Sequence, residues 1–429
     1  MFEILRDPLW NNIRVDELTL RLIDTRTFQR LRNIRQLGLA YVVYPGATHS
    51  RFEHALGAYH LSRQTLALLC EADDAFPISG EDQTIVRSAA LLHDIGHYPF
   101  SHALEEIGQL HHEDVARPLI TTGEVAEILT ARMGAEAPER IFELIRGVSD
   151  SPLQGLISGS LDLDKIEYLK RDAFMCGVPY GEIDVDRLTN SMLVLDDPET
   201  GRPTLGVREK GLSALESLLF AKYQMHRNVY WHHAVRSATA MYKRMVDDAL
   251  RSRALDASLL PSYTDEGLLH HLEHSQPGPM LDSLRTRRLH KRALEWPASR
   301  LDEGYGEWIA TDRERTRQAE DRLAADFGMQ PGEVLLDFPA KTEMLGLDIP
   351  VLRRSGAIER LTGEGWPGTI NLPTLSAELY RSARWLRVFT ARRVTIPFEA
   401  VSELIEEAGA DQKIVTGDQG EILTQHSGL

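Results

Sequence analysis

The chain has 429 residues, of which 42% are hydrophobic and 26% are charged, and its formal net charge at pH 7 is −16. This length and hydrophobic content allow a large buried core, with room for one large domain and one or two smaller ones. A chain this acidic repels nucleic-acid backbones and anionic membranes on average, so a polyanionic ligand requires local basic residues or a metal ion.

Helical patterns dominate the first half of the chain. Asp24 or Thr25 is expected to cap a helix whose apolar residues recur every three positions and which ends at Gly38. The aromatic and β-branched run at 41–44 predicts a short strand or an extended turn. Further helices are expected over residues 51–70, 82–94, 124–133, 138–147, 163–174 and 212–250.

The second half of the chain changes character. Residues 255–264 are expected to form a loop or boundary, and residues 265–330 are expected to be helical. Short strands are predicted at 334–338, 348–352, 369–372 and 384–389, followed by a strand and a helix over 395–408. These patterns predict a mainly α-helical body with a smaller α+β C-terminal region.

The cysteines and the N-terminus bear on the cellular location. Cys70 and Cys176 lie far apart and form neither a disulfide scaffold nor a CxxC zinc motif. The N-terminus has no basic segment followed by an apolar run, and no apolar stretch approaches the ~20 residues that a membrane span needs. We therefore expect a cytoplasmic protein without a membrane anchor.

Histidine is concentrated in one region, where 8 of the 16 histidines lie between residues 49 and 112. His93 and Asp94 are adjacent at the expected end of a helix, His54 lies in the preceding helix, and Asp164 lies just inside a later one. Two imidazoles and two carboxylates suit Mn, Fe, Ni or Zn and, less well, Mg. Four protein ligands leave room in an octahedral shell for water and a phosphate oxygen, as metal-assisted hydrolysis requires.

A His-Asp dipeptide alone indicates nothing, because it arises by chance, and a single histidine here is more often a core or surface residue than a ligand. The set of ordered blocks around it is far more specific. These blocks read DPL at 7–9, IDT at 23–25, FQRLR at 28–32, QLG at 36–38, YPGATH at 44–49, RFEH at 51–54, HDIGH at 93–97, PFSH at 99–102, HE at 112–113, DK at 164–165 and RD at 171–172.

The blocks resemble the HD-superfamily deoxynucleoside triphosphate (dNTP) triphosphohydrolases, in the branch that contains the human SAM-and-HD-domain dNTPase and its bacterial relatives. The resemblance covers roughly residues 5–250 and is looser at residues 348–352. It implies a mainly α fold, an HD-domain helical core with a smaller α+β C-terminal region. The expected divisions are an HD phosphohydrolase catalytic core at 1–255, a helical extension at 256–340 and a small α+β region at 341–429.

The resemblance also implies roles for individual residues. The implied metal ligands are His54, His93, Asp94 and Asp164. The residues implied to act at the scissile bond are His97, His102, His112 and Arg51. The expected reaction is metal-assisted attack of water on the α-phosphorus, with a histidine protonating the departing 5′-oxygen. The products are a deoxynucleoside and tripolyphosphate, and the cofactor is a divalent metal ion: Mn, Fe, Ni, Zn or Mg.

The residues implied to contact the substrate are Gln36, Leu37, Arg51, Lys165, Tyr168, Asp172, Lys222, His226 and Tyr230. Lys165 and Tyr168 are expected to face phosphate and sugar, and Asp172 the 3′-hydroxyl. Lys222, His226 and Tyr230 recur every four residues and so share a helix face. A polar face over the core is the alternative interpretation of that spacing.

An effector site is a separate expectation from the resemblance. Asp24, Gln29 and Arg32 match guanine- and phosphate-contacting positions of a nucleotide site between subunits. However, the N-terminal segment that would supply a lysine carries Glu3 instead, and an acid repels a triphosphate. Activation by a dNTP or GTP effector is therefore left open. The alternative for Arg30, Arg32 and Arg35 is a solvated helix face or a salt-bridged subunit contact.

The resemblance implies a homo-oligomer, a dimer or a tetramer, that takes a dNTP substrate. Two other functions stay open. One is an HD-type phosphodiesterase or nucleotidase acting on another phosphate ester, although the Gly-Tyr-Pro block of the cyclic-dinucleotide branch is absent from this sequence. The other is a nucleotide sensor or nucleic-acid-binding protein with a remnant HD site, for which an inter-subunit basic groove is conceivable but not indicated.

Overall fold

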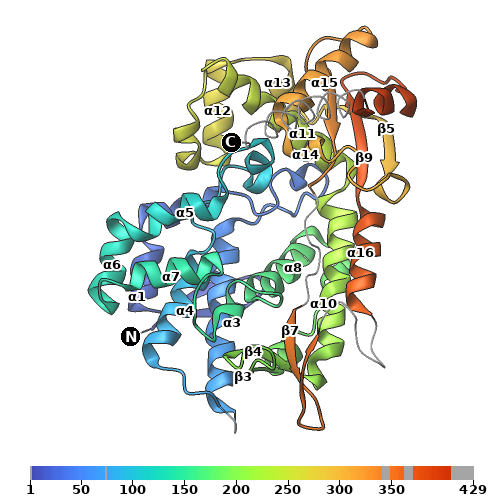
Figure 1. Ribbon diagram of the computed structural model, residues 1–429. Coiled ribbons are helices and arrows are strands. Elements are labelled where there is room, and N and C mark those ends of the chain that lie inside the picture. The colour runs from blue at the N-terminus through green and yellow to red at the C-terminus, as the bar shows by residue number, and fades with distance from the viewer. Residues whose placement is uncertain (1, 73–74, 341–347, 362–370, 407–429) are drawn as a thin grey trace, which may run out of the picture.

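The computed structural model describes residues 2–72, 75–340, 348–361 and 371–406. Helices dominate it and the sheets are small, so the predicted mainly α class is confirmed (Figure 1). In this part of the chain no helix is both long enough and apolar enough to cross a bilayer.

Helix α3 (Arg51–Glu71) lies at the centre, packed against α4 (Gly80–Leu92) and α8 (Leu163–Cys176). The start of α3 is stabilised by a reciprocal capping box in which the side chains of Ser50 and Glu53 bind each other's backbone N–H groups. Asp162 caps α8 by accepting the backbone N–H of Lys165. These caps place the first turns of α3 and α8, where candidate site residues lie.

The predicted helices of the core are confirmed within a few residues at each end. Beyond α3, α4 and α8, they are α6 (Gly123–Met133) and α7 (Ala137–Arg146). Helix α4 packs on α7, and α5 (His112–Thr121) packs on α6 and α7. Leu66, Leu91 and Ile166 are among the buried apolar side chains that join these helices into one core.

The predicted helix ending at Gly38 is wrong in its length. Thr25 does cap a helix, α2, but α2 ends after one turn (Arg26–Gln29) and continues as a 3-10 turn over Arg30–Asn33. The predicted strand at 41–44 is also wrong, because Ala40–Val42 forms a 3-10 turn. Both segments pack on buried neighbours. Where the local sequence pattern is short, these tertiary contacts determine the backbone conformation.

The expected single helix over 212–250 is two helices. Helix α10 (Leu212–Met225) passes into a π-helical turn at His226–Tyr230, and α11 (His233–Arg251) follows after a break. A π-turn shifts the side chains that follow it around the helix, and such turns occur often at functional sites. The periodicity of the sequence does not reveal this insertion.

The predicted all-helical segment 265–330 contains a strand, β5 (Lys291–Pro297), between α13 (Pro279–Arg285) and α15 (Arg313–Asp326). Of the strand predicted at 369–372, residues 369–370 lie outside the described residues and Leu372 begins α16 (Leu372–Ala383). The strand expected near 395 is not formed, although residues 398–406 are helical as predicted.

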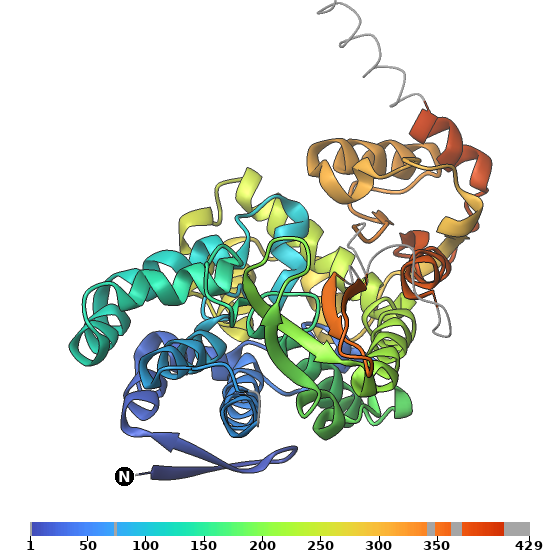
Figure 2. The ribbon, with the colours of Figure 1, turned by 60° about the horizontal axis from the view of Figure 1, so that its bottom comes forward.

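The strands form three small sheets, of which the N-terminal hairpin (blue) lies at the lower edge of the view in Figure 2. The N-terminal hairpin pairs β1 (Phe2–Asp7) with β2 (Asn11–Asp16). The second sheet has the order β3 (Met192–Asp196), β4 (Pro203–Arg208), β7 (Ile349–Leu352), β8 (Ile358–Leu361), and the third has the order β5, β9 (Trp385–Thr390), β6 (Val334–Asp337). Strand β7 lies parallel to β4 beside the core, whereas β9 joins β5 and β6. The strands after residue 340 are therefore divided between two sheets.

Candidate active site

Four side chains expected to bind a metal converge between α3, α8 and the turn after α4. His54 Nε2 lies 3.1 Å from His93 Nε2, 3.0 Å from Asp164 Oδ1 and 3.4 Å from Asp94 Oδ2. His93 Nε2 lies 3.4 Å from Asp94 Oδ1 and 3.5 Å from Asp164 Oδ1. Ligands bound at about 2.1 Å from one ion are spaced about 3.0 Å apart in an octahedron and about 3.4 Å in a tetrahedron. The spacing therefore fits one divalent cation.

The tautomers of the two histidines support the same conclusion. His54 Nδ1 lies 2.6 Å from Glu167 Oε2, and His93 Nδ1 lies 2.9 Å from the carbonyl oxygen of Ala90. Both contacts require a proton on Nδ1, so in the neutral form of each imidazole Nε2 directs a lone pair toward the centre. Two lone pairs and two carboxylates then face one another, and only positive charge satisfies them. The donor atoms of His54, His93 and Asp164 lie close enough together to hold a metal ion, and Asp94 lies beside both histidines.

The electrostatics of His54 agree with this geometry. Burial lowers the pKa of its imidazole, but the carboxylates of Asp164 and Glu167 outweigh burial and raise that pKa to about 10. Arg51 and His93 hold the pKa of Asp94 well below its usual range, against the effect of burial. The centre of the cluster thus attracts positive charge.

Glu167 was not identified from the sequence, although it lies one helical turn after Asp164, on the same face of α8. Besides His54, it accepts hydrogen bonds from Arg171 at 2.8 Å and from Trp10 Nε1 at 2.9 Å. It reaches His54 over Gly57, where an added Cβ would stand 1.9 Å from Glu167 Oε1. Gly57 therefore provides the space through which α8 orients a candidate metal ligand on α3.

Replacing Glu167 by glutamine is expected to weaken metal binding by about 10- to 100-fold, because the neutral amide no longer makes His54 a more basic ligand. Titration with Mn²⁺ followed by electron paramagnetic resonance measures this affinity. Glu320→Gln is the matched control, since Glu320 is equally buried and binds Arg244 and Arg313 away from the cluster. Equal Mn²⁺ affinities of the two variants would refute the orienting role of Glu167.

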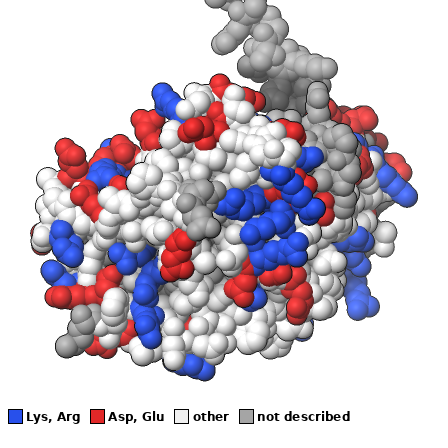
Figure 3. All heavy atoms as spheres, turned by 90° about the horizontal axis from the view of Figure 1, so that it is seen from below, with Lys and Arg blue, Asp and Glu red and all other residues white. Residues whose placement is uncertain are grey.

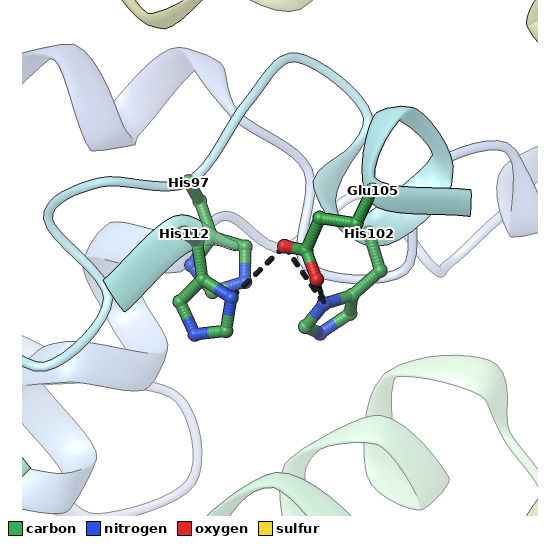
Figure 4. A group of neighbouring side chains, drawn as sticks. All are labelled: His97, His102, Glu105 and His112. Atoms are coloured by element: carbon green, nitrogen blue, oxygen red, sulfur yellow. Dashed lines mark hydrogen bonds and ion pairs between the residues drawn. The ribbon is translucent and has the colours of Figure 1, made fainter. Parts of the chain in front are cut away.

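A second cluster contains His97, His102, Glu105 and His112 (Figure 4). The His97 and His112 rings are 3.8 Å apart between centroids, and the His97 and His102 rings are 4.8 Å apart. The Glu105 carboxylate accepts a hydrogen bond from His112 Nδ1 at 2.9 Å and lies 3.4 Å from His102 Nδ1. All three histidines expected at the scissile bond are therefore brought together, and Glu105 orients two of them.

The protonation of this cluster follows from burial and from its charged neighbours. Burial lowers the pKa of His97 well below the usual imidazole range, and Arg51 adds to this effect. Burial also lowers the pKa of His112, although Glu105 partly opposes it. Glu105 itself has a lowered pKa, because its hydrogen bonds to His102 and His112 outweigh burial. Neutral, buried imidazoles beside an ionised carboxylate are suited to proton transfer.

Gly96 lets the two parts of this cluster approach. A Cβ at this position would lie 2.1 Å from the carbonyl oxygen of His112 and 2.6 Å from the backbone nitrogen of Ala116. The first turn of α5 therefore packs directly on the backbone between His93 and His97, which brings the His112 ring onto His97.

Arg51 joins the two clusters. Its Nη1 donates to Asp94 Oδ2 at 2.6 Å, its Nε donates to Ser101 Oγ at 3.1 Å, and its Nη2 lies 3.3 Å from His102 Nε2. The guanidinium thus lies between a candidate metal ligand and a candidate acid–base histidine. A phosphoryl group bound there meets positive charge on one side and an imidazole on the other.

Asp172 is the centre of a buried polar group formed with His49 and Tyr230. His49 Nε2 lies 2.8 Å from Asp172 Oδ1, and the Tyr230 hydroxyl donates to Asp172 Oδ2 at 2.7 Å. Among the described residues, His49 Nδ1 and Gln36 Oε1 are buried without a hydrogen-bond partner. The backbone nitrogen of Gln36 donates to the carbonyl of His49, so these unsatisfied groups belong to adjoining segments. Substrate hydroxyls are suitable partners for them.

Two lysines predicted to contact substrate lie close together. Lys165 Nζ binds Asp162 and donates to the carbonyl of Gly159 at 2.8 Å. Lys222 is buried on α10, and burial together with the nearby Lys165 lowers the pKa of its ammonium to about 8. One turn later His226 Nδ1 binds the carbonyl of Lys222 at 2.9 Å. A buried ammonium near a second one is stabilised by a bound anion.

The other predicted substrate contacts border these groups. Tyr168 is partly buried, and its ring centroid is 6.5 Å from that of His54. Leu37 is partly buried and packs against the core beside Tyr44. The contacts of these residues with a substrate stay predictions.

The residues expected at an effector site lie at the surface. Asp24 is exposed at the end of α1 (Glu17–Ile23), and Arg32 Nε donates to Gln29 Oε1 at 2.8 Å. The surface alternative does not hold for Arg30, which donates to the carbonyls of Ile95, His97 and Tyr263. Arg35 lies 3.5 Å from Asp265. An effector role for Asp24, Gln29 and Arg32 stays a prediction.

The charge distribution on the lower face of the molecule bears on nucleic-acid binding. Seen from below, lysine and arginine side chains gather in a patch that aspartate and glutamate side chains border (Figure 3). A nucleic-acid backbone prefers a continuous basic surface, which this face does not offer.

Comparison with known proteins places these clusters in a family context. The HD domain matches residues 51–172, and the HD associated region matches residues 183–362. Over 329 residues the chain is 34% identical to an uncharacterised protein of Methanocaldococcus jannaschii, covering 76% of this chain and 67% of that protein. Over 267 residues it is 30% identical to the deoxynucleoside triphosphate triphosphohydrolase SAMHD1 of Bos taurus, covering 54% of this chain and 44% of that enzyme.

A crystal structure shows the same architecture. A hypothetical protein from Aquifex aeolicus superimposes with a TM-score of 0.69 at 29% sequence identity, covering 96% of this chain and 100% of the other. The chain spans only about half the length of the further relatives, 42–56% of each. The matched HD domain contains both clusters, from Arg51 through Asp164.

Proposed function

Because this chain belongs to the HD-domain family, we propose that it is a metal-dependent hydrolase of deoxynucleoside triphosphates that cleaves at the α-phosphorus. The products are a deoxynucleoside and tripolyphosphate. The observation that carries the proposal is the position of Arg51, which contacts Asp94 of the metal-binding cluster and His102 of the histidine cluster. A phosphorus atom held at Arg51 lies between an activating cation and a proton donor, as cleavage of a phosphate ester requires.

His54, His93, Asp94 and Asp164 would hold the metal ion. When bound, it would activate water and neutralise charge on the phosphate. Arg51, Lys165 and Lys222 supply the further positive charge that a triphosphate of about four negative charges needs. His226 follows in the π-helical turn as a neutral imidazole, because burial lowers its pKa to about 3.

Asp172, Tyr230, Tyr168, Gln36 and Leu37 would form the sugar subsite. Asp172 keeps lone pairs for a 3′-hydroxyl while His49 and Tyr230 hold its carboxylate in place. Similarity to the bovine relative, a deoxynucleoside triphosphate triphosphohydrolase, supports a deoxynucleotide as the substrate.

The histidine cluster would move the proton. Glu105 accepts a hydrogen bond from His112 Nδ1–H and thereby orients that ring, so that Nε2 is available for proton transfer. The neutral imidazole takes up a proton from solvent at Nε2 and donates it to the departing 5′-oxygen, while the ionised Glu105 stabilises the transient imidazolium. His97 packs on His112 and His102 completes the wall of the site.

The first test is product analysis after incubation with each dNTP and Mn²⁺ or Mg²⁺, alone and in mixtures. Tripolyphosphate with deoxynucleoside is the expected product. A requirement for a second nucleotide would support the effector site at Asp24, Gln29 and Arg32 and, with it, a dimer or tetramer. Monophosphate or orthophosphate would refute cleavage of the bond between the α-phosphorus and the 5′-oxygen and favour another HD phosphohydrolase. No turnover with any mixture would favour a nucleotide sensor.

Replacing Lys222 by glutamine is expected to raise KM for the dNTP by about 10- to 100-fold, because a charged hydrogen bond to phosphate is lost. Steady-state kinetics at saturating Mn²⁺ give KM and kcat. Lys210→Gln, at a lysine in the short turn before α10, is the control. An unchanged KM for Lys222→Gln would exclude this lysine from the phosphate subsite.

A further inference from the structure

The backbone immediately before His102 is strained. Phe100 and Ser101 both adopt left-handed conformations, with φ of 58° and 62°. Residues with a side chain rarely adopt this conformation, and two in succession persist only where the surroundings hold them. Gly38 packs against this turn so closely that a Cβ on Gly38 would lie 2.9 Å from the carbonyl oxygen of Phe100. The turn begins the 3-10 helix Ser101–Ile107, which carries His102 and Glu105.

Asp265 holds this turn. It is the first residue of α12 (Asp265–Ser275) and is 2% exposed. Its Oδ1 accepts the backbone N–H of Phe100 at 2.7 Å, and its Oδ2 accepts the backbone N–H of Arg35 at 2.9 Å. One carboxylate therefore ties two segments that are 165 and 230 residues distant from it in sequence.

Both of these segments lead into the candidate active site. Ser101 Oγ donates to the carbonyl oxygens of Arg35 and Gln36 at 2.7 and 3.0 Å, and it accepts from Arg51 Nε at 3.1 Å. The position of the Ser101 hydroxyl thus depends on the strained turn and sets the Arg51 guanidinium. His102 follows Ser101 directly, so the turn that Asp265 holds also sets where this ring stands.

The residues on either side of the Phe100–Ser101 turn are anchored by α11. The Tyr242 hydroxyl on α11 donates to the carbonyl of Pro99 at 3.1 Å. Arg236, also on α11, donates to Glu106 at 2.9 and 3.0 Å and to Asp337 of β6. Lys243 Nζ donates to Glu106 at 2.7 Å. Residues 99–106 are thus anchored by α11 and α12, both of which lie outside the matched HD domain at 51–172.

We propose that Asp265 is a positioning residue for the hydrolysis, which sets Arg51 and His102 through the strained Phe100–Ser101 turn. The proposal rests on the proposed function, in which Arg51 and His102 act at the phosphorus. It assigns to the region after the HD domain the task of completing the geometry of the active site, while Asp265 itself binds the backbone of Phe100 and Arg35 and not the four candidate metal ligands.

The test is the isosteric variant Asp265→Asn, in which one of the two backbone N–H groups faces an amide N–H instead of an oxygen. We expect kcat to fall by about 10- to 100-fold, because small displacements of catalytic groups have effects of this size. The Mn²⁺ affinity should stay within twofold of that of the unmodified protein. The imidazole ¹H–¹⁵N signals of His102, assigned with His102→Gln, should shift.

The matched control is Asp247→Asn, since Asp247 is another buried aspartate, bound to Arg251 and Arg313 away from the active site. Its kcat and its His102 signals should be unchanged. If Asp265→Asn does not fold, Tyr242→Phe removes the neighbouring anchor at Pro99 and should still lower kcat and shift the His102 signals. A kcat equal to that of the control, or a loss of Mn²⁺ affinity, would overturn the proposal.

Failure of the proposed hydrolysis and failure of the positioning role of Asp265 give different results. If the unmodified protein releases a product other than tripolyphosphate, kcat is measured on the phosphate ester that it does cleave, and the prediction for Asp265→Asn is unchanged. If it cleaves none, the His102 signals still report the ring position without any substrate. Unshifted signals in Asp265→Asn then refute the positioning role.

Discussion

Replacing Asp164 by alanine is expected to remove the bound metal ion and to lower turnover by about 1000-fold or more, because the metal activates the attacking water. Asp164 Oδ1 lies 3.0 Å from His54 Nε2 and 3.5 Å from His93 Nε2, so its loss opens one side of the cluster. It also removes the negative charge that balances the cation. Metal content by inductively coupled plasma mass spectrometry, together with kcat on the same samples, measures both effects.

The matched control for Asp164 is Asp186→Ala. Asp186 also lies in the first turn of a helix, α9 (Val185–Thr189), but outside the cluster, so any general effect of losing a first-turn acid is reproduced there. That variant should keep its metal and its activity. A fully metallated, active Asp164→Ala protein would exclude Asp164 as a ligand.

Replacing His112 by alanine is expected to lower kcat by about 100- to 10,000-fold, the range that general acid–base catalysis contributes, while metal and nucleotide still bind. His112 contacts His97 and Glu105 but none of the four candidate metal ligands at hydrogen-bond distance. Single-turnover kinetics at saturating dNTP measure the chemical step, and Mn²⁺ titration measures binding.

His274→Ala is the control for His112, since His274 is an exposed histidine on α12. Metal content must also be measured for His112→Ala, because its cluster could itself bind an ion. The donor atoms of His97, His102, Glu105 and His112 lie within 4.8 Å of one another, a spacing that can hold an ion. Loss of metal from His112→Ala would therefore identify His112 as a ligand of a second ion rather than as an acid.

The core helices could be predicted because their signals are local. A cap such as Ser50 or Asp162, followed by apolar residues at helical spacing, lies within a few residues of the backbone that it determines. The predictions failed where neighbours distant in sequence decide the backbone. The π-turn at His226–Tyr230 and the strand β5 are such cases, since β5 forms only by pairing with β9, about 100 residues later.

In the candidate site, too, some residues could be predicted from local patterns and others could not. Its reactive residues stand in recognisable blocks, whereas the residues that orient them do not. Glu167 binds His54 from 113 residues away, and Glu105, which binds His112, lies outside the blocks that carry the resemblance. Asp265 occurs in a segment that resembles an ordinary helix start, because Thr264 caps it like any other. Nothing in the local pattern of these carboxylates distinguishes them from surface acids.

The sequence by itself determined the mainly α class, the core helices and the donor set of two imidazoles and two carboxylates. These properties depend on residue type and short spacing, which a chain carries whether or not it is folded. Only the tertiary structure decided that His54 and His93 lie 3.0–3.5 Å from each other and from the carboxylates of Asp94 and Asp164. It also decided that Arg51 joins Asp94 to the histidine cluster and that Asp265 holds the strained turn beside it. Those relations exist only after packing brings distant segments together, because burial and close contact are properties of the folded core and not of its segments.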